Sequence, residues 1–234
     1  MQTSEKIAIR TSDGGTMNCY MAKANKESAP AIIVIQEIFG ITKFLKSSAD
    51  WLASQGFHAL VPDLFWRLEP GLELNPSEPE QRQKAFELLG KFDQSQGVED
   101  LKGVITYLKN HSAVSGKVGC VGYCLGWLMA YFMACRSEVQ TSVSYYGVGI
   151  DEQLGEASNI KAPLMLHIAG EDAFTPAEKV QKIKQVLDPN PLATIHVYPE
   201  MDHAFCRVGG EHYNKENADL ANSRTLQFFT DNLK

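Results

Sequence analysis

The fold class is most readily inferred from Lys117-Val118-Gly119-Cys120-Val121-Gly122-Tyr123-Cys124-Leu125-Gly126-Trp127. Its first half can form a short β-strand, and a helical pattern begins directly after it. Between the two, residues 122–126 have the form G-x-C-x-G, which is the nucleophile-elbow pattern with cysteine in place of serine. The two glycines give the chain the clearance it needs to turn sharply, so that the Cys124 side chain stands out at the top of a sheet. Because buried cysteines are mostly inert, the pattern alone is also compatible with Cys124 as an inert core residue.

Composition limits the classes of protein to consider. The chain has 234 residues, of which 44% are hydrophobic and 21% charged, a size that suits one domain with a sizeable core. The formal net charge is −6, which argues against nucleic acid or an anionic membrane surface as a partner. No run of roughly 18 apolar residues is present, so no membrane span is expected.

The cysteines indicate free thiols. They fall at positions 19, 120, 124, 135 and 206, an odd number without metal-ligand spacing. The first residues do not read as a signal peptide. Together these features predict a reducing, cytoplasmic location with free thiols and no metal site.

Strand and helix patterns alternate along the chain. Residues 62–98, here called the excursion, are polar and punctuated by proline, and such segments usually lie over a site as a cap. The alternation predicts a single α/β domain over residues 1–234, with a mostly parallel central sheet and helices on both faces. The predicted strands are 6–10 and 16–21 (a hairpin), 31–36, 58–61, 117–121, 141–146, 163–169 and 194–198. The predicted helices are 44–55, 80–91, 98–108, 124–136, one opened by Pro176, and 216–233.

Four polar residues follow predicted strand ends: Glu37, Cys124, Asp172 and His203. In an α/β sheet the functional residues gather at the carboxyl ends of the strands. The chain order of nucleophile, acid and histidine is that of the α/β-hydrolases. We therefore expect a Cys-His-Asp triad, in which His203 accepts the thiol proton and Asp172 fixes the tautomer of His203.

The base and the acid each have competitors. His167 and His196 fall inside strands and His212 lies far into a polar loop, which favours His203. Asp202 adjoins His203 and is the alternative acid, although it could instead form a local turn. The remaining histidines are His58 and His111, and the remaining cysteines are expected to be passive.

A tetrahedral oxyanion needs two donors. In this fold they are the N–H of the residue after the nucleophile, Leu125, and an N–H from the loop after an early strand, where Ile38 is the expected donor. The N-terminus of the helix that starts at Cys124 also favours negative charge there.

Four motifs together resemble the dienelactone hydrolases, also called carboxymethylenebutenolidases, over nearly the whole chain. They are residues 36–40 (QEIFG), 122–126 (GYCLG), 170–172 (GED) and 203–207 (HAFCR). The resemblance implies hydrolysis of an unsaturated lactone that bears a carboxylate, as in chloroaromatic breakdown. It further implies a monomeric α/β-hydrolase that needs no cofactor.

The same resemblance implies roles for further residues. Glu37 corresponds to the carboxylate that meets the resting thiol and is displaced when substrate arrives. Arg82 and Arg207 correspond to a pair that binds the substrate carboxylate. The chain departs from the family at Trp127, where a third glycine is common, and at Phe86, where a tyrosine is usual. The pocket residues assigned in this way are Phe39, Phe86, Trp127 and Tyr146.

Two other functions remain open at this point. An esterase or thioesterase would use the same mechanism on a different acyl group. A panel of lactone, ester and thioester substrates would separate this function from lactone hydrolysis. A relative without turnover would bind a small ligand or sense oxidants through Cys124. It predicts sulfenic acid and no acyl-enzyme.

Overall fold

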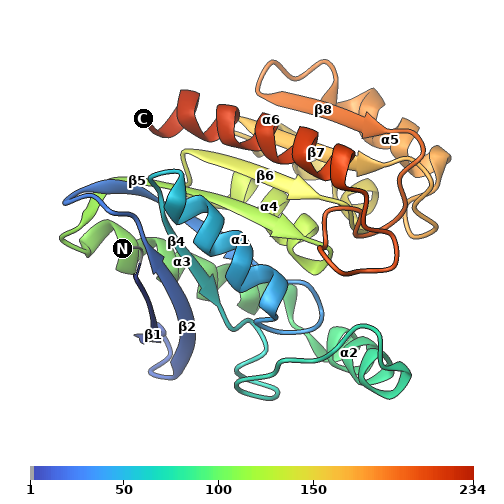
Figure 1. The fold of residues 1–234 in the computed structure, drawn as a ribbon. Coiled ribbons are helices and arrows are strands. Elements are labelled where there is room, and N and C mark those ends of the chain that lie inside the picture. The colour runs from blue at the N-terminus through green and yellow to red at the C-terminus, as the bar shows by residue number, and fades with distance from the viewer. Residues whose placement is uncertain (1–2) are drawn as a thin grey trace. The chain divides into compact units, whose positions relative to one another are not determined.

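The computed structural model describes residues 3–234, which divide into two compact units. The first unit extends to Cys120, and the second comprises Val121–Lys234. Eight strands follow the order β1-β2-β4-β3-β5-β6-β7-β8 in one sheet, and helices pack against them (Figure 1). The predicted α/β class with a mostly parallel sheet is confirmed.

The first unit opens with the predicted hairpin. Strand β1 pairs antiparallel with β2, β2 pairs antiparallel with β4, and β3 pairs parallel with β4. Strands β3 and β4 are buried along their whole length, which is why they read as continuous apolar runs. The elements are β1 (Thr3–Arg10), β2 (Thr16–Lys23), β3 (Ala29–Ile35), α1 (Lys43–Ser54), β4 (His58–Pro62), α2 (Pro79–Lys91), α3 (Gln94–Asn110) and β5 (Val114–Tyr123), whose end lies in the second unit.

Helix α1 packs on the sheet of the first unit through one apolar stripe. Leu45, Ala49, Leu52 and Ala53 are its buried residues, at the spacing of one helical face. The helix ends just before Gly56, which has a φ of 89°. Glycine adopts this left-handed conformation with little strain. In Figure 1 this helix lies in front of β4 and α3 lies behind it.

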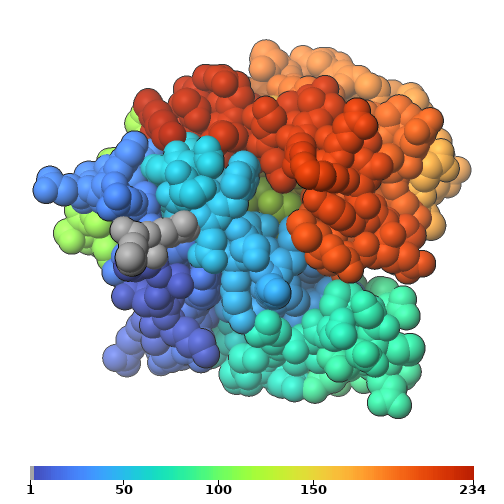
Figure 2. Space-filling model, viewed as in Figure 1, coloured from blue at the N-terminus to red at the C-terminus, as the bar shows by residue number. Residues whose placement is uncertain are grey.

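The excursion carries α2, which begins with Pro79 at its first turn. Only Ala85 and Leu88 of this helix are buried. Arg82 and Phe86 are exposed. The excursion therefore contributes surface to the first unit, as its teal atoms show in Figure 2.

In the second unit β6, β7 and β8 pair parallel in sequence order. Helix α6 lies in front of these strands in Figure 1, and α4 lies behind them. The elements are α4 (Leu125–Arg136), β6 (Thr141–Tyr145), the short 3₁₀ turns η1 (Ile150–Glu152) and η2 (Leu154–Asn159), β7 (Leu164–Ala169), α5 (Ala177–Leu187), β8 (Ala193–Tyr198) and α6 (Lys215–Leu233).

Helix α4, which carries the elbow, has no polar face. Every residue from Leu125 to Cys135 is buried, as expected for a helix that is apolar all round. Two buried serines of β6 fasten it, because Ser142 Oγ donates to Ala130 O at 2.6 Å and Ser144 Oγ donates to Trp127 O at 2.9 Å. The start of α4 is therefore fixed against β6.

Two local features differ from the sequence-based expectation. Helix α3 begins at Gln94, earlier than the expected start at position 98, because Asp93 Oδ1 accepts a capping hydrogen bond from Gln96 N–H at 3.0 Å. The turns η1 and η2 were not expected at all.

Candidate active site

The elbow at Cys124 is a strained turn. Cys124 has φ 56° and ψ −105°, a conformation that non-glycine residues seldom adopt, and it immediately precedes α4. A Cβ added at Gly122 would lie 1.8 Å from Gly126 O, so only glycine fits there. Gly122 thus provides the clearance that the sequence pattern indicated on this side of Cys124.

The end of β6 holds the elbow in this conformation. Cys124 N–H is shared between Tyr145 O at 3.2 Å and Tyr146 O at 3.0 Å, and Trp127 N–H donates to Cys124 O at 3.0 Å. Gly147 fits closely beneath, since a Cβ there would lie 2.4 Å from Cys124 O. The main-chain N–H and C=O of Cys124 are therefore both occupied, and its half-buried side chain is the part left for chemistry.

The loop after β8 brings His203 to the loop after β7. His203 Nδ1 donates to Asp172 Oδ2 at 2.7 Å, and Asp172 Oδ1 accepts from Phe174 N–H at 2.9 Å. The Asp172 side chain is 1% exposed, whereas that of His203 is 14% exposed. Both oxygens of the buried carboxylate are thereby satisfied, and the ring is held in one orientation.

Asp202, the competing acid, makes different contacts. Its Oδ1 accepts from the backbone N–H of His203 at 2.6 Å, and its Oδ2 lies 3.5 Å from His212 Nδ1. It therefore shapes the loop locally, while Asp172 is the carboxylate bonded to the His203 ring.

The charge on His203 depends on Cys124. Burial lowers the pKa of His203, but the negative charge of the Cys124 sulfur and hydrogen bonds to Asp172 and Cys124 outweigh it and raise this pKa to about 10. The rings of Tyr146 and Phe174 stand edge-on to His203, with centroids 5.3 and 5.1 Å away. The surroundings therefore favour the protonated form of the His203 ring.

The other cysteines and histidines lie in different surroundings. Burial raises the pKa of Cys19 to about 12 and that of Cys135 to about 11, and it raises that of Cys206 well above its ordinary value. Burial also lowers the pKa of His167 well below its ordinary value, and this ring bonds to Tyr198 and Thr225. These groups are neutral core side chains near neutral pH.

The loop after β3 carries three candidate residues of the first unit. Glu37 is fully buried, and Ile38 and Phe39 are almost so. Gly40, which follows them, has φ 78°, and a Cβ at this position would lie 1.9 Å from Leu72 O. The loop therefore depends on a glycine and on the excursion for its shape.

The candidate pocket residues of the second unit fall into two groups. Arg207 is half-buried in the loop after His203. Trp127 and Tyr146 are each 1% exposed. The Cβ of Trp127, the residue that replaces the family's third glycine, lies 2.5 Å from where a Cβ on Gly147 would be. The base of its side chain therefore lies at the end of β6, next to the elbow.

Comparison with known proteins gives the family. The sequence pattern of the Dienelactone hydrolase family matches residues 17–233. The chain belongs to the dienelactone hydrolase family. It is 40% identical to the carboxymethylenebutenolidase of Pseudomonas putida, over 96% of this chain and 95% of that protein. It is also 34% identical to carboxymethylenebutenolidase 1 of Cupriavidus pinatubonensis, over 96% and 95% of the two chains.

A solved dienelactone hydrolase structure has a similar fold. The dienelactone hydrolase from Anabaena variabilis superimposes with a TM-score of 0.73 over 100% of this chain and 99% of that chain, at 16% identity. As a member of the dienelactone hydrolase family, the chain is an enzyme of the ester and lactone hydrolase class.

This dienelactone hydrolase family member also has site residues that the sequence analysis missed. Phe174 is 47% exposed with its ring against His203, and Thr175 Oγ1 donates to Gly147 O at 2.5 Å. The Thr175 hydrogen bond ties the loop of Asp172 to the end of β6, next to the elbow. The only signal in the sequence was that Phe174 and Thr175 lie two and three residues after Asp172.

Residues 3–234 contain neither a cluster of metal ligands nor a helix able to span a membrane. Among these residues no group of three or more His, Cys, Asp and Glu side chains is placed to hold a metal ion. None of the helices described for this part of the chain combines the length and the apolar character that crossing a membrane requires.

Proposed function

We propose that this enzyme hydrolyses small lactones that bear a carboxylate, through a covalent acyl-enzyme on Cys124. The observation that carries the proposal is the linkage of three side chains. Cys124 stands on a strained elbow, His203 interacts with the Cys124 sulfur, and Asp172 bonds the far nitrogen of His203 at 2.7 Å. A nucleophile, a base and a residue that orients the base are the parts that acyl transfer requires.

In the first half of the reaction the Cys124 thiolate attacks the lactone carbonyl carbon. The carbonyl π electrons move to oxygen, and the tetrahedral oxyanion accepts hydrogen bonds from the N–H groups of Leu125 and Ile38. As the first residue of α4, Leu125 has an N–H that no carbonyl within the helix can accept. Collapse of this intermediate breaks the ring C–O bond, and His203 gives its proton to the departing oxygen.

In the second half, water releases the product. His203, now neutral, takes a proton from water as the water oxygen attacks the thioester carbon. The C–S bond breaks, the thiolate leaves, and the product is the open-chain acid. Asp172 keeps the imidazole oriented in both halves and stabilises the imidazolium.

Glu37 is proposed as a guard of the resting thiol. A buried carboxylate beside Cys124 would oppose the thiolate by like-charge repulsion, while the imidazolium of His203 favours it. Displacement of Glu37 by an anionic substrate would then leave the imidazolium unopposed. Glu37 is buried, and a negative charge at a buried position is screened less by solvent than one at the surface.

Arg82 and Arg207 are proposed to bind the substrate carboxylate. A protein of net charge −6 must bind an anion through particular side chains, and a guanidinium can make two parallel hydrogen bonds to a carboxylate. Phe39, Phe86, Trp127 and Tyr146 are proposed as the apolar walls of the pocket.

We also propose the setting in which this reaction occurs. The chemistry needs only side chains and water, so no cofactor is assigned. Residues 1–234 are proposed to form a single catalytic domain that acts as a cytoplasmic monomer, without nucleic acid or membrane partners.

An esterase or thioesterase activity on a different small acyl group is the second candidate. Phe86 favours it, because its ring is 46% exposed and offers no hydroxyl to a polar substrate. The mechanism would be unchanged.

A substrate panel with mass detection tests the proposal. Purified enzyme would be offered a carboxylate-bearing lactone, a neutral ester and a thioester of similar size, and Cys124→Ala would serve as the control. We expect the lactone to have the highest kcat/KM and the acyl mass to appear on Cys124. A preference for the thioester would favour the second candidate, and reversible sulfenic acid without any acyl-enzyme would favour a thiol sensor.

A further inference from the structure

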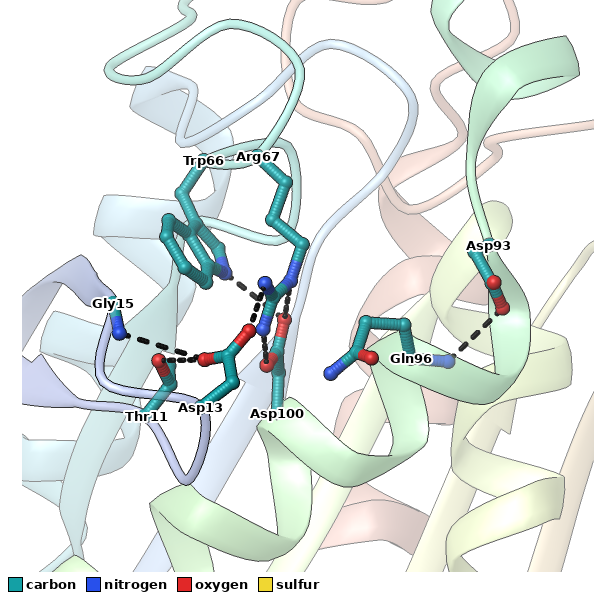
Figure 3. Close-up of polar contacts among 8 residues, drawn as sticks. All are labelled: Thr11, Asp13, Gly15, Trp66, Arg67, Asp93, Gln96 and Asp100. Carbon is teal, nitrogen blue, oxygen red and sulfur yellow. Dashed lines mark hydrogen bonds and ion pairs between the residues drawn. The ribbon is translucent and has the colours of Figure 1, made fainter.

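A buried carboxylate links the start of the excursion to helix α3. Asp100 follows the excursion in α3, and it accepts three hydrogen bonds from the two residues Trp66 and Arg67 at its start (Figure 3). Trp66 Nε1 and Arg67 Nε donate to Oδ2 at 2.9 and 3.2 Å, and Arg67 Nη2 donates to Oδ1 at 2.8 Å. Asp100 is 4% exposed, so the carboxylate of this two-pronged ion pair is shielded from water, whereas the Arg67 side chain is 28% exposed.

Arg67 has a second carboxylate partner on the other side. Its Nη1 lies 2.5 Å from Asp13 Oδ2 in the turn of the β1–β2 hairpin, and Thr11 Oγ1 donates to Asp13 Oδ1 at 2.6 Å. The Asp13 side chain is 48% exposed. The hydrogen bond from Arg67 holds the pKa of Asp13 well below its ordinary value. Arg67 therefore ties the excursion both to α3 and to the hairpin.

The turn after β4 connects this ion pair to residue 71. Leu68 N–H and Glu69 N–H both donate to Phe65 O at 2.8 Å, and the buried carboxylate of Asp63 accepts from Phe65 N–H and Gly71 N–H. These bonds make residues 63–71 one hydrogen-bonded unit. Arg67 and Gly71 therefore belong to the same hydrogen-bonded turn, and Leu72 follows it directly.

The next residues of the excursion bond directly to the loop after β3. Ile41 N–H donates to Leu72 O at 3.2 Å, and Leu74 N–H donates to Phe39 O at 2.9 Å. These two bonds flank Gly40, whose lack of a side chain permits the approach of Leu72. Ile38, the proposed oxyanion donor, precedes Phe39 by one residue.

We propose that Asp100 is a positioning residue for catalysis. Through Arg67 it fixes residues 63–74, and these fix the loop that carries Ile38. The same bonds fix the start of the excursion, which carries Arg82 on α2. This inference rests on the proposed function, because it assigns the oxyanion N–H to Ile38. Loss of the Asp100 bonds should leave the chain folded but let this loop move, and small displacements of an oxyanion donor have large kinetic effects.

The two partners of Arg67 supply a matched pair of variants. Asp100→Asn and Asp13→Asn each remove one carboxylate charge from Arg67, but only the first loosens the start of the excursion from α3. With a neutral ester, at a temperature where each variant is folded, we expect Asp100→Asn to lower kcat by roughly 10-fold, a fraction of the effect of deleting an oxyanion donor. Asp13→Asn should stay within about twofold of wild type. Asp100→Glu, which keeps the charge, should recover part of the lost kcat.

Amide hydrogen exchange supplies a readout that does not depend on activity. Exchange at Ile41 and Leu74 should accelerate in Asp100→Asn and stay near wild type in Asp13→Asn. If Asp100→Asn does not fold, Arg67→Lys weakens the same two-pronged contact and takes its place. Equal kinetics and equal exchange in the two Asn variants would overturn the inference, as would a lower melting temperature with unchanged kcat. Failure of the proposed function would appear separately, as full activity in Cys124→Ala.

Discussion

Asp172 holds the ring of His203 by a 2.7 Å hydrogen bond while its own side chain is 1% exposed. Asp172→Asn keeps the shape of this contact but removes the charge that stabilises the imidazolium. We expect kcat to fall by roughly 10²- to 10⁴-fold with little change in the melting temperature. Steady-state kinetics on the preferred substrate measure this. Full activity in Asp172→Asn together with a large loss in Asp202→Asn would reverse the assignment of the acid.

The pKa of His203 should fall when Cys124 is replaced by alanine. Two of the causes that raise this pKa to about 10 are the charge of the Cys124 sulfur and its hydrogen bond, and both disappear in the variant. Titration of the ring by NMR in the two proteins tests this. An unchanged midpoint would show that Asp172 alone sustains the imidazolium.

The same group predicts how stability varies with pH. The folded pKa of about 10 exceeds the ordinary value of 6.5, so proton binding to His203 favours the folded state. This contribution is fully present below pH 6.5 and is lost as the pH rises through about 10. Denaturant unfolding across that range should show a steeper loss of stability in wild type than in Cys124→Ala.

Gly122 should tolerate no side chain. A Cβ there would lie 1.8 Å from the main-chain oxygen of Gly126, and neither segment can yield without unmaking the elbow. Gly122→Ala is expected to lose activity and to lower the melting temperature. Gly155→Ala is the control in the same unit, because a Cβ on Gly155 meets nothing within 4 Å. Comparable melting and activity in the two variants would contradict a tight elbow.

Arg207→Ala and Arg82→Ala should be selective for anionic substrates. Each charged hydrogen bond contributes about 1.5–3 kcal/mol, so kcat/KM for a carboxylate-bearing lactone should fall by roughly 10- to 150-fold. A neutral ester of similar size should be affected little. Kinetics on both substrates decide the point, and equal losses would mean that the arginines serve the fold instead.

Glu37→Gln should make the resting thiol more reactive. Removing the carboxylate removes the like charge that is proposed to oppose the thiolate. Alkylation of Cys124 at neutral pH, followed by mass spectrometry, should therefore be faster in the variant. Slower or equal labelling would remove Glu37 from this role.

Local patterns in the sequence were sufficient to predict the strands, the α-helices and the polar residues at strand ends. The elbow is a pentapeptide, α1 has a regular apolar spacing, and β3 is a continuous apolar run, so each could be read within a short window. The loops of Asp172 and His203 could be placed because parallel strands end at the same edge of a sheet.

Contacts between distant positions could not be read in this way. Arg67 and Asp100 lie 33 residues apart in polar segments, and no periodicity links them. Phe174 has no motif of its own, so its contact with His203 follows only from the conformation of the loop. The turns η1 and η2 lack the length that a helical pattern needs to be recognised.

The absence of a polar face on α4 has a consequence for attempts to change what this enzyme accepts. Each side chain from Leu125 to Cys135 is enclosed, so a larger or smaller residue anywhere along it must be absorbed by neighbours that also hold the elbow. Helix α2 is the opposite case, with only Ala85 and Leu88 buried. Libraries aimed at new substrates should therefore be concentrated on α2, where most positions can vary independently of folding, and should leave α4 untouched.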